Sequence, residues 1–380
     1  MNIHKLDRRQ FILGTTALVA GSGLASFGIE SRAVTKVPTI DALDIKVLVD
    51  SSYDSPRPGT NQWVKIKRTP FISTKDYRKA LHNEWGLALA LESRIGQDKK
   101  SMLLDYGYTP AALMGNMEIM DVKPDRQDAM ILSHGHFDHF GGLIAFLKAN
   151  RSKLPSDLTL YVGGEDNFCN RKTASGAPGH FSDWGVLDRR ELDALKVKIV
   201  YCEKPTIIQG HAFTTGIINR DSFEKVLPNT LVEFSKKNGI GCDMPELNAK
   251  AEGKFVKDDH IHEHGTAFNL KDRGLIVISS CGHAGIVNTV QQAINVSGVN
   301  KVHAILGGFH LFPAPNDYLI STVEALKQFN PDVVIPLHCS GPAFVTTMRS
   351  ILSDRLVTST TGTEFQFGSW CSGIGQLALP

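Results

Sequence analysis

Short apolar runs alternate with amphipathic segments along most of the chain. Runs rich in Val, Ile and Leu that end at Gly, Asp or Ser are typical of buried strands, and apolar residues spaced three or four apart indicate helices. Strands are predicted at 44–52, 86–93, 101–107, 128–134, 158–163, 197–202, 265–270, 274–281, 302–308, 333–338 and 363–367. Helices are predicted at 110–120, 140–150, 285–297, 317–329 and 342–353. This alternation predicts an α/β fold whose sheets are covered by helices.

The segment 164–260 has a weaker pattern than the rest of the chain. It contains charged runs and glycine-rich stretches with little periodicity. We interpret it as an insertion within one large domain that spans 34–380. Because irregular segments on a rigid scaffold often carry specificity, we expect it to shape a substrate pocket. A solvated surface segment is the alternative.

Residues 1–33 have the features of an export signal. Arg8 and Arg9 precede a short, weakly apolar stretch rich in glycine, and Ser31-Arg32-Ala33 is a small-x-small cleavage site. The arginine pair resembles a twin-arginine signal. We therefore predict a partnership with the twin-arginine translocation machinery and a periplasmic or secreted protein. An uncleaved membrane anchor and a surface arginine pair before a buried helix are the alternatives.

Charge and cysteine content narrow the function classes. The whole chain carries a formal charge of +2, and removing 1–33 takes away four basic and two acidic residues, which leaves zero. A neutral protein lacks the basic surface that nucleic acid binding requires, so we expect a small-molecule substrate and no nucleic acid partner. The six cysteines form no C-x-x-C pair. Disulfides are allowed outside the cytoplasm, but spacing does not assign one.

The sequence SHGHFDHFGG at 133–142 is the strongest chemical signal. His134 ends a predicted strand, and His136, Asp138 and His139 follow in a short loop before two glycines. Each of these hydratable side chains loses free energy on burial unless it finds a partner, and metal ions would supply partners for all of them. Four ligands within six residues cannot easily reach one tetrahedral ion, but they can divide between two neighbouring ions.

This H-x-H-x-D-H motif resembles that of the metallo-β-lactamase superfamily of metal-dependent hydrolases. The resemblance implies an αββα sandwich, in which two sheets are flanked by helices. It also implies that two ions divide the ligands. The first ion would take His134, His136 and His283, and the second would take Asp138, His139 and His338. The last histidine of each set follows a predicted strand.

Further segments are similar to one branch of this superfamily. LVDSSYDS, HNEWGLALALE, LLDYGYTPAALMGNMEIM, CGHAGIVNTV, GGFHL and PLHCSGP resemble the group named for dihydropterin-6-yl-methyl (ribofuranosyl)aminobenzene phosphate synthase. The resemblance implies positions near the active-site floor for Asp50, Glu84, Asp105 and Asn116. Ordinary turn or cap chemistry is their alternative. Residues 84–91 and 263–270 are also similar to each other, which suggests two related strand pairs or a chance match.

One ligand of the family pattern is missing. The superfamily usually has a metal-bridging aspartate on the strand between the last two histidines, whereas this chain has ILGGFHL at 305–311. Either His310 takes a metal or substrate role, or one ion is held more weakly. A second group, His260, His262 and His264 within 258–264, alternates as on one face of a strand. Because the resemblance implies no ligands there, we predict a polar edge or pocket wall.

Two cysteines adjoin the implied ligands, so thiolate ligation is an alternative. Cys281 precedes His283 by two positions, and Cys339 follows His338. Neighbours in a strand point to opposite faces, so Cys339 should point away from a ligating His338. We therefore predict that both cysteines are small packed residues.

The implied chemistry is metal-dependent hydrolysis. Zinc bound by neutral histidines lowers the pKa of a coordinated water to about 7, which provides hydroxide near neutral pH. We expect one or two zinc ions, with Mn or Fe as alternatives, and an ester, lactone or phosphodiester substrate. In this scheme Asp138 orients the nucleophile, and His310 protonates the leaving group.

The sequence also suggests substrate-binding residues and two alternative functions. Arg171, Lys172 and Asn116 are the predicted substrate-binding residues, and the two cations would hold a phosphate. A solvated charge pair is the alternative for the cations. One alternative function is a transferase that joins a pterin to an aminobenzene ribosyl phosphate, and another is a non-catalytic exported metal-binding protein.

Overall fold

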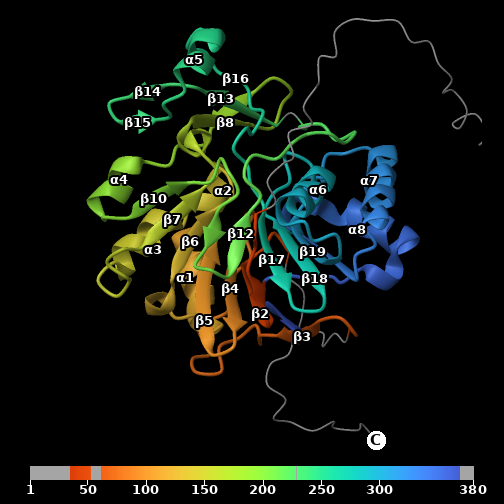
Figure 1. The fold of residues 1–380 in the computed structure, drawn as a ribbon. Helices are drawn as coiled ribbons and strands as arrows, with labels where there is room; N and C mark the ends of the chain where they lie inside the picture. The colour runs from red at the N-terminus through yellow and green to blue at the C-terminus, as the bar shows by residue number, and fades with distance from the viewer. Residues whose placement is uncertain (1–34, 53–60, 228, 369–380) are drawn as a thin grey trace, which may run out of the picture. The chain divides into compact units, whose positions relative to one another are not determined.

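Two β-sheets face each other, and helices cover the outer face of each (Figure 1). The computed structural model describes residues 35–52, 61–227 and 229–368, which all belong to one unit, 34–380. The predicted export signal lies outside the described residues, so the boundary at 33 stays a prediction. The layered arrangement confirms the predicted αββα sandwich.

The first sheet has the strand order β10-β7-β6-β5-β4-β2-β21-β3. Its members are β2 (Ala42–Val49), β3 (Lys65–Arg68), β4 (Ala88–Ile95), β5 (Asp98–Leu104), β6 (Ala129–Leu132), β7 (Thr159–Val162), β10 (Lys198–Tyr201) and β21 (Thr363–Gly368). Strands β5, β6, β7 and β10 are parallel. The carboxyl end of β6, from which the histidine motif leaves, therefore lies at the same edge of the sheet as those of its parallel neighbours.

The second sheet has the order β11-β12-β17-β18-β19-β20, with β1 paired to β17. Its members are β1 (Thr39–Ile40), β11 (Ile207–Ile208), β12 (Ala212–Thr214), β17 (Thr266–Leu270), β18 (Gly274–Ser279), β19 (Val302–Gly308) and β20 (Val333–Leu337). Strands β18, β19 and β20 are parallel neighbours. Their carboxyl ends therefore meet at one edge.

Helices cover both sheets on the sides that face away from each other. The α-helices beside the two main sheets are α1 (Pro110–Ile119), α2 (Phe137–Phe140), α3 (Leu143–Asn150), α4 (Arg189–Ala194), α6 (Ile286–Ser297), α7 (Asn316–Gln328) and α8 (Gly341–Ile351). Single 3-10 turns occur at Pro124–Arg126, Glu165–Phe168, His338–Ser340 and Ser353–Arg355. Helices α1, α3 and α4 lie beside the first sheet, and α6, α7 and α8 beside the second (Figure 1). No helix within the described ranges is long and apolar enough to cross a membrane.

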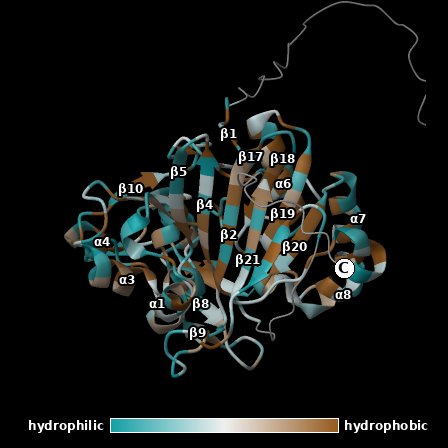
Figure 2. Cartoon of the chain, turned by 90° about the horizontal axis from the view of Figure 1, so that it is seen from below, coloured by the Kyte–Doolittle hydropathy of each residue, from teal (hydrophilic) through white to brown (hydrophobic). Residues whose placement is uncertain are grey.

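Strand alternation divides the core into three apolar layers. On β5, Leu103 packs toward α1 and α3, whereas Met102 and Leu104 pack toward the second sheet, because successive side chains point to opposite faces. On the second sheet, Ile276 and Ile278 face the first sheet while Val277 packs against α6 to α8. Figure 2 shows the resulting hydrophobic positions along the strands. Strands that are buried on both faces read as near-continuous apolar runs, which explains their clear signal in the sequence.

The predicted insertion is not a single block. Between its two halves the chain returns to the main sheets through β10, β11 and β12. The rest forms a separate four-stranded sheet, a two-stranded pair and a helix. These elements are β8 (Asn170–Ala174), β9 (Phe181–Asp183), β13 (Thr230–Glu233), β14 (Lys236–Lys237), β15 (Ile240–Gly241), α5 (Pro245–Ala251) and β16 (Val256–Lys257). The disulfide Cys169–Cys242 joins the residue before β8 to the residue after β15.

The predicted strands and long helices are all present within a few residues of their expected bounds. The strands of the small sheet were missed because they are short and lack an apolar run, and β9 and β16 are also largely exposed. The one-turn helix α2 was also missed. It begins immediately after His136 and contains Asp138 and His139, which makes part of the predicted loop helical.

Candidate metal centre

The candidate site lies where strands of both sheets end. His134 follows β6, His283 follows β18, His310 follows β19 and His338 follows β20 directly. The ends of β18, β19 and β20 share an edge because these strands are parallel. The fold thereby brings together histidines that are far apart in the sequence.

The first ligand group consists of His134, His136 and His283. Ring centroids of His134 and His136 are 4.5 Å apart, and that of His283 lies 5.0 Å from His134 and 4.7 Å from His136. Gly135 allows the close turn between the first two histidines, because a Cβ at this position would lie 2.4 Å from the carbonyl oxygen of Asn167. The structure therefore assembles the three histidines predicted for the first ion.

The second ligand group consists of Asp138, His139 and His338. Oδ2 of Asp138 lies 3.7 Å from Nε2 of His139 and 3.4 Å from Nε2 of His338. The two groups adjoin, since the rings of His134 and His139 are 4.3 Å apart. All six residues are buried. The predicted ligands of both ions thus lie in one cluster.

Hydrogen bonds on the far side of each ring orient the ligands. Nδ1 of His139 lies 2.7 Å from Oδ2 of Asp105, and the hydroxyl of Ser133 donates to the same oxygen at 2.7 Å. That hydroxyl oxygen lies 2.9 Å from Nδ1 of His134 and can accept a hydrogen bond from the Nδ1–H group. Nδ1 of His338 lies 2.9 Å from the hydroxyl of Ser51. In His134, His139 and His338 the Nδ1 side has a protein partner, which leaves Nε2 for a metal.

Burial keeps the first ligand group neutral. The pKa of His134 is held well below its ordinary value by burial and by the neighbouring His139 and His136. Burial and nearby histidines lower the pKa of His283 in the same way. Neutral imidazole is the form that binds a metal ion, so no proton would have to leave these rings.

The second ligand group combines an ionised carboxylate with imidazoles whose pKa values are raised. Burial opposes ionisation of Asp138, but His139 and His338 outweigh it and hold the pKa of Asp138 below its ordinary value. Burial likewise opposes protonation of His139, yet Asp138 and Asp105 raise its pKa. A metal cation at this position would compensate the buried charge of Asp138.

Several buried atoms of the cluster have no hydrogen-bond partner among the residues that the structure describes. They are Nε2 of His134, His139 and His310, both ring nitrogens of His283, and Oδ1 of Asp138. Leaving so many buried polar atoms unsatisfied is costly, and buried polar groups in proteins normally have partners. Divalent ions fit this donor set of imidazoles and a carboxylate.

His260 also belongs to the cluster, contrary to the prediction of a polar edge. The segment 258–264 is a loop and not a strand, and His260 itself has φ +47°. Its ring stacks on His283 with centroids 3.8 Å apart. His262 instead pairs with Asp166, and His264 with the carbonyl of Leu132. The density of His and Asp in this segment was the available signal, but strand alternation was the wrong rule for it.

The two cysteines are buried, as expected for packed residues, but the predicted orientation of Cys339 is wrong. His338 and Cys339 lie in a 3-10 turn, with His338 at φ +47°, so the alternation of a strand does not separate them. Sγ of Cys339 lies 3.2 Å from Sγ of Cys281. Sγ of Cys281 lies 3.6 Å from Nδ1 of His310, which places all three side chains at the cluster.

The four residues implied to lie near the floor have two kinds of role. Asp50 accepts the backbone N–H of His338 at 2.7 Å, and Asp105 holds His139, so both support ligands. Glu84 accepts the backbone N–H groups of Tyr108 and Thr109 where α1 begins. Glu84 therefore has the cap role that was its alternative.

The side-chain amide of Asn116 makes its hydrogen bonds within the fold. Its amide nitrogen donates to the carbonyls of Leu48 and His82 at 2.7 and 2.6 Å, and its oxygen accepts from the N–H of His82 at 2.9 Å. Because the side chain is completely buried, the structure does not support the predicted substrate contact. Asn116 instead joins α1 to two neighbouring segments.

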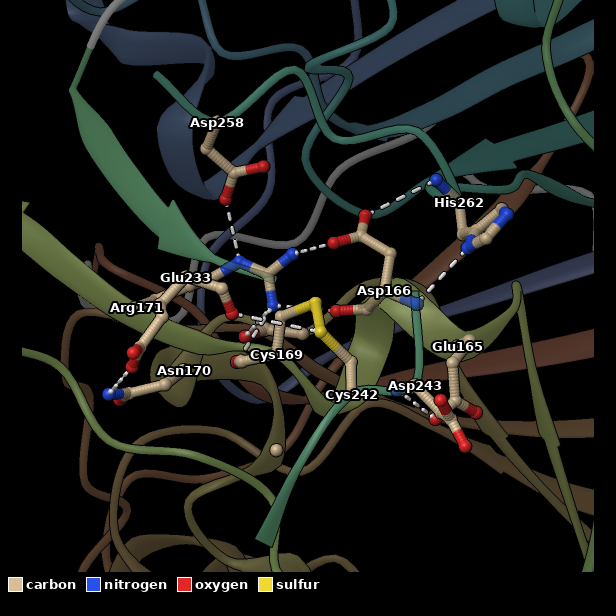
Figure 3. Close-up of a disulfide and its surroundings, with 12 residues drawn as sticks. Glu165, Asp166, Cys169, Asn170, Arg171, Glu233, Cys242, Asp243, Asp258 and His262 are labelled. Carbon is tan, nitrogen blue, oxygen red and sulfur yellow. Dashed lines mark hydrogen bonds and ion pairs between the residues drawn. A yellow bond between two sulfur atoms is a disulfide. The ribbon is translucent and has the colours of Figure 1, made fainter. Parts of the chain in front are cut away.

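Arg171 is buried between two carboxylates (Figure 3). It donates from Nε to Asp258 at 2.6 Å and from Nη2 to Asp166 at 2.5 Å. Asp258 in turn lies 3.8 Å from Nε2 of His136. The predicted phosphate contact of Arg171 does not fit, because its donors are used inside the protein. Lys172 points elsewhere, with Nζ 3.5 Å from Asp183 and 4.6 Å from the Phe255 ring, and its substrate contact stays a prediction.

A pocket of about 470 Å³ opens beside the second ligand group. Exposed Trp85 and Phe312 form part of its wall, and the Trp85 ring lies 5.0 Å from that of His338. Arg349 also lines it. The volume is in the range of small-molecule sites, and the wall combines aromatic surface with one cation.

Comparisons with known proteins agree with this geometry. A family model described as the metallo-β-lactamase superfamily matches residues 94–156, which include the histidine motif. The chain is 31% identical over 268 residues to 7,8-dihydropterin-6-methyl-4-(β-D-ribofuranosyl)-aminobenzene-5'-phosphate synthase of Methanocaldococcus jannaschii, covering 70% of this chain and 84% of the relative. An uncharacterised protein of that organism is 25% identical over 249 residues, or 64% of this chain and 80% of its own length.

A solved structure supports the fold. The crystal structure of a metal-dependent hydrolase of the β-lactamase superfamily superposes with a TM-score of 0.60 at 19% identity, covering 85% of this chain and 98% of that chain. At this identity the match concerns the fold alone. Together with the sequence relatives, it shows that the chain belongs to the metallo-β-lactamase superfamily, in the branch that resembles the dihydropterin ribofuranosyl-aminobenzene phosphate synthase.

Proposed function

We propose that the protein is a metal-dependent hydrolase of an ester, lactone or phosphodiester. The observation that carries this proposal is the buried cluster of unpartnered histidine nitrogens and a carboxylate oxygen at the strand ends. Divalent ions held there would supply Lewis acidity and a nucleophile drawn from water. Zinc suits the imidazole donors best, and Mn or Fe are the alternatives.

The chain's own residues have distinct roles in this proposal. Asp138, kept ionised by its histidine neighbours, would bind the second metal ion and would also accept a hydrogen bond from the attacking water. His310 is buried beside His283, with ring centroids 4.1 Å apart and a free Nε2. It is placed to give a proton to the departing oxygen. The pocket with Trp85 and Phe312 would hold the apolar part of the substrate.

The test is activity and metal content of the His136→Ala variant. This change should lower the metal content and abolish hydrolysis across a panel of esters, lactones and phosphodiesters, while the circular dichroism spectrum stays unchanged. His180→Ala, which alters an exposed histidine, is the matched control and should keep both properties. Full hydrolysis by a folded His136→Ala protein would reject the proposal.

A synthase is the second candidate, because the 31% identical relative has that name. The protein would then join a dihydropterin to a ribofuranosyl-aminobenzene phosphate, as the relative's name describes. Product formation from these two compounds, without hydrolysis of the ester panel, would favour it. A protein that binds metal tightly and catalyses neither reaction would be a metal-binding protein that has lost catalysis.

We further propose export through the twin-arginine translocation machinery to the periplasm or the cell exterior. The Arg8-Arg9 pair motivates this proposal, and the Cys169–Cys242 disulfide supports it because such bonds persist in oxidising compartments. Replacing both arginines by lysine should leave the protein in the cytoplasm, as cell fractionation would show. Unchanged export of that variant would contradict the route.

A further inference from the structure

The sulfur of Cys281 lies at the junction of the two ligand groups. Sγ of Cys281 belongs to three groups of side chains that could hold a metal ion, and within each group all the ligand atoms lie within 4.8 Å of one another. These sets are His134, Cys281 and His283; His139, Cys281 and His338; and Cys281, His310 and Cys339. Cys281 is therefore close to ligands of the first group and of the second, which is the position that a bridging ligand occupies.

The strand that would carry a bridging aspartate in this superfamily has no side chain to offer here. Gly308 ends β19, and a Cβ built on it would lie 2.3 Å from the carbonyl oxygen of Ser280 and 2.9 Å from Sγ of Cys339. A larger residue could not be placed there without moving that sulfur. The sulfur of Cys339 thus occupies space beside the end of this strand.

The sulfur of Cys339 is held in place by the surrounding backbone, and the sulfur of Cys281 lies against it. The N–H of His310 donates to Sγ of Cys339 at 3.2 Å, and Sγ of Cys339 lies 3.3 Å from the carbonyl oxygen of Cys281. The three side chains are buried, and Nε2 of His310 has no hydrogen-bond partner among the described residues. Two sulfurs are therefore placed next to the two ligand groups.

We propose that the Cys281 thiolate binds between the two metal positions, in place of the missing bridging carboxylate, with Cys339 beside it. This inference rests on the proposed metal-dependent function. Metal binding releases the thiol proton of Cys281 to solvent, so the site should prefer metals that accept thiolate. Thiolate and imidazole donors favour zinc, whereas manganese and magnesium prefer oxygen donors.

X-ray absorption at the zinc edge of the wild-type, zinc-loaded protein is the first test, since it needs no variant and no substrate. A sulfur shell at about 2.3 Å beside the nitrogen shell at about 2.0–2.1 Å is expected. A full complement of zinc surrounded only by nitrogen and oxygen would overturn the proposal. So would a Cys281–Cys339 disulfide in the metal-loaded protein, because its sulfurs would no longer be thiolates.

Cobalt substitution of purified variants identifies which cysteine supplies the sulfur ligand. The wild type should show a near-ultraviolet thiolate-to-cobalt charge-transfer band that Cys281→Ser loses and Cys339→Ser weakens. Cys202→Ser is the matched control, because Cys202 is also a free buried cysteine but lies at the end of β10. An undiminished band in a folded Cys281→Ser protein would reject the assignment. Sulfur ligation without any hydrolysis would support this inference and reject the hydrolase. Hydrolysis without sulfur ligation would reject this inference and support the hydrolase.

Discussion

Nδ1 of His139 lies 2.7 Å from Oδ2 of Asp105, and neither side chain is exposed to solvent. The same carboxylate accepts the backbone N–H and the hydroxyl of Ser133, the residue before His134. One carboxylate therefore orients a histidine of each ligand group. Asp105 does not reach the metal positions itself, so its effect on the site passes through the rings that it holds.

Replacing this carboxylate should weaken metal binding without removing a ligand. Because such supporting partners fix the tautomer and orientation of the ligand, we expect Asp105→Asn to lower metal affinity about 10- to 100-fold. Competition with a chelator measures this change. Asp128→Asn is the control, because Asp128 only accepts the N–H of Ser101 at the other end of β6. Equal affinity of the Asp105 variant and the wild type would contradict the positioning role.

Arg171 should matter to stability, unlike its neighbour Lys172. Removing the guanidinium leaves the carboxylates of Asp166 and Asp258 buried without their cation, so Arg171→Met should lower the free energy of unfolding by about 3–5 kcal/mol. Lys172→Ala breaks an ion pair with Asp183, whose side chain is mostly exposed, and should cost less than about 1 kcal/mol. Denaturant unfolding measures both. A stable Arg171 variant with weakened substrate binding would restore the predicted phosphate contact.

Asp44 should make stability depend on pH. Burial raises its pKa to about 6, partly offset by the hydrogen bond from Gln366. A carboxyl whose pKa is higher in the folded protein contributes stability that is complete below its unfolded value of 3.8 and is lost as the pH rises through about 6. Asp44→Asn should therefore stabilise the protein by about 1–2 kcal/mol at pH 7.5, because the group is partly exposed, and by roughly half as much at pH 5.

Unfolding curves at several pH values test this sign. Asp125→Asn, at an exposed position, is the control and should change stability little at any pH. A stabilisation by Asp44→Asn that grew toward low pH would contradict the assignment.

The disulfide should stabilise the subdomain that carries Arg171. Cys169 and Cys242 are separated by 73 positions, and closing a loop of this size restricts the unfolded chain. The double variant Cys169→Ser with Cys242→Ser should lose about 2–4 kcal/mol of unfolding free energy. Thermal unfolding under oxidising conditions measures the loss, with Cys202→Ser as the cysteine control. Identical melting of the double variant and the wild type would show that the bond contributes nothing.

Replacing Trp85 should change substrate binding and leave the metal content unchanged. Its ring lies 6.1 Å from that of Phe312 and 5.0 Å from that of His338, and 46% of its surface is exposed. Trp85→Ala should raise KM and lower kcat/KM roughly tenfold for substrates with an apolar group, because aromatic contact area is lost. Metal content should stay constant. Tyr77→Ala, at 82% exposure, is the control. Unchanged KM would place the substrate outside this pocket.

Local patterns in the sequence were sufficient for the strands, the long helices and the core of the metal site. Strands such as β18 and β19 are buried on both faces and therefore read as apolar runs. His134 to His139 lie within six residues, so their proximity required no knowledge of the fold. His283 and His338 followed from their positions after strands, together with the resemblance to a known superfamily.

Tertiary structure alone decided which other residues join the site. His260 and Cys281 reach the cluster from segments whose proximity arises only when the two sheets pack together. His338 adopts φ +47°, which cancels the alternation rule that had turned Cys339 away. Arg171 was predicted to bind a substrate phosphate, with a solvated charge pair as the alternative, yet the structure buries it between two carboxylates. Sequence spacing specifies local geometry, whereas burial and long-range contacts depend on how the layers close over each side chain.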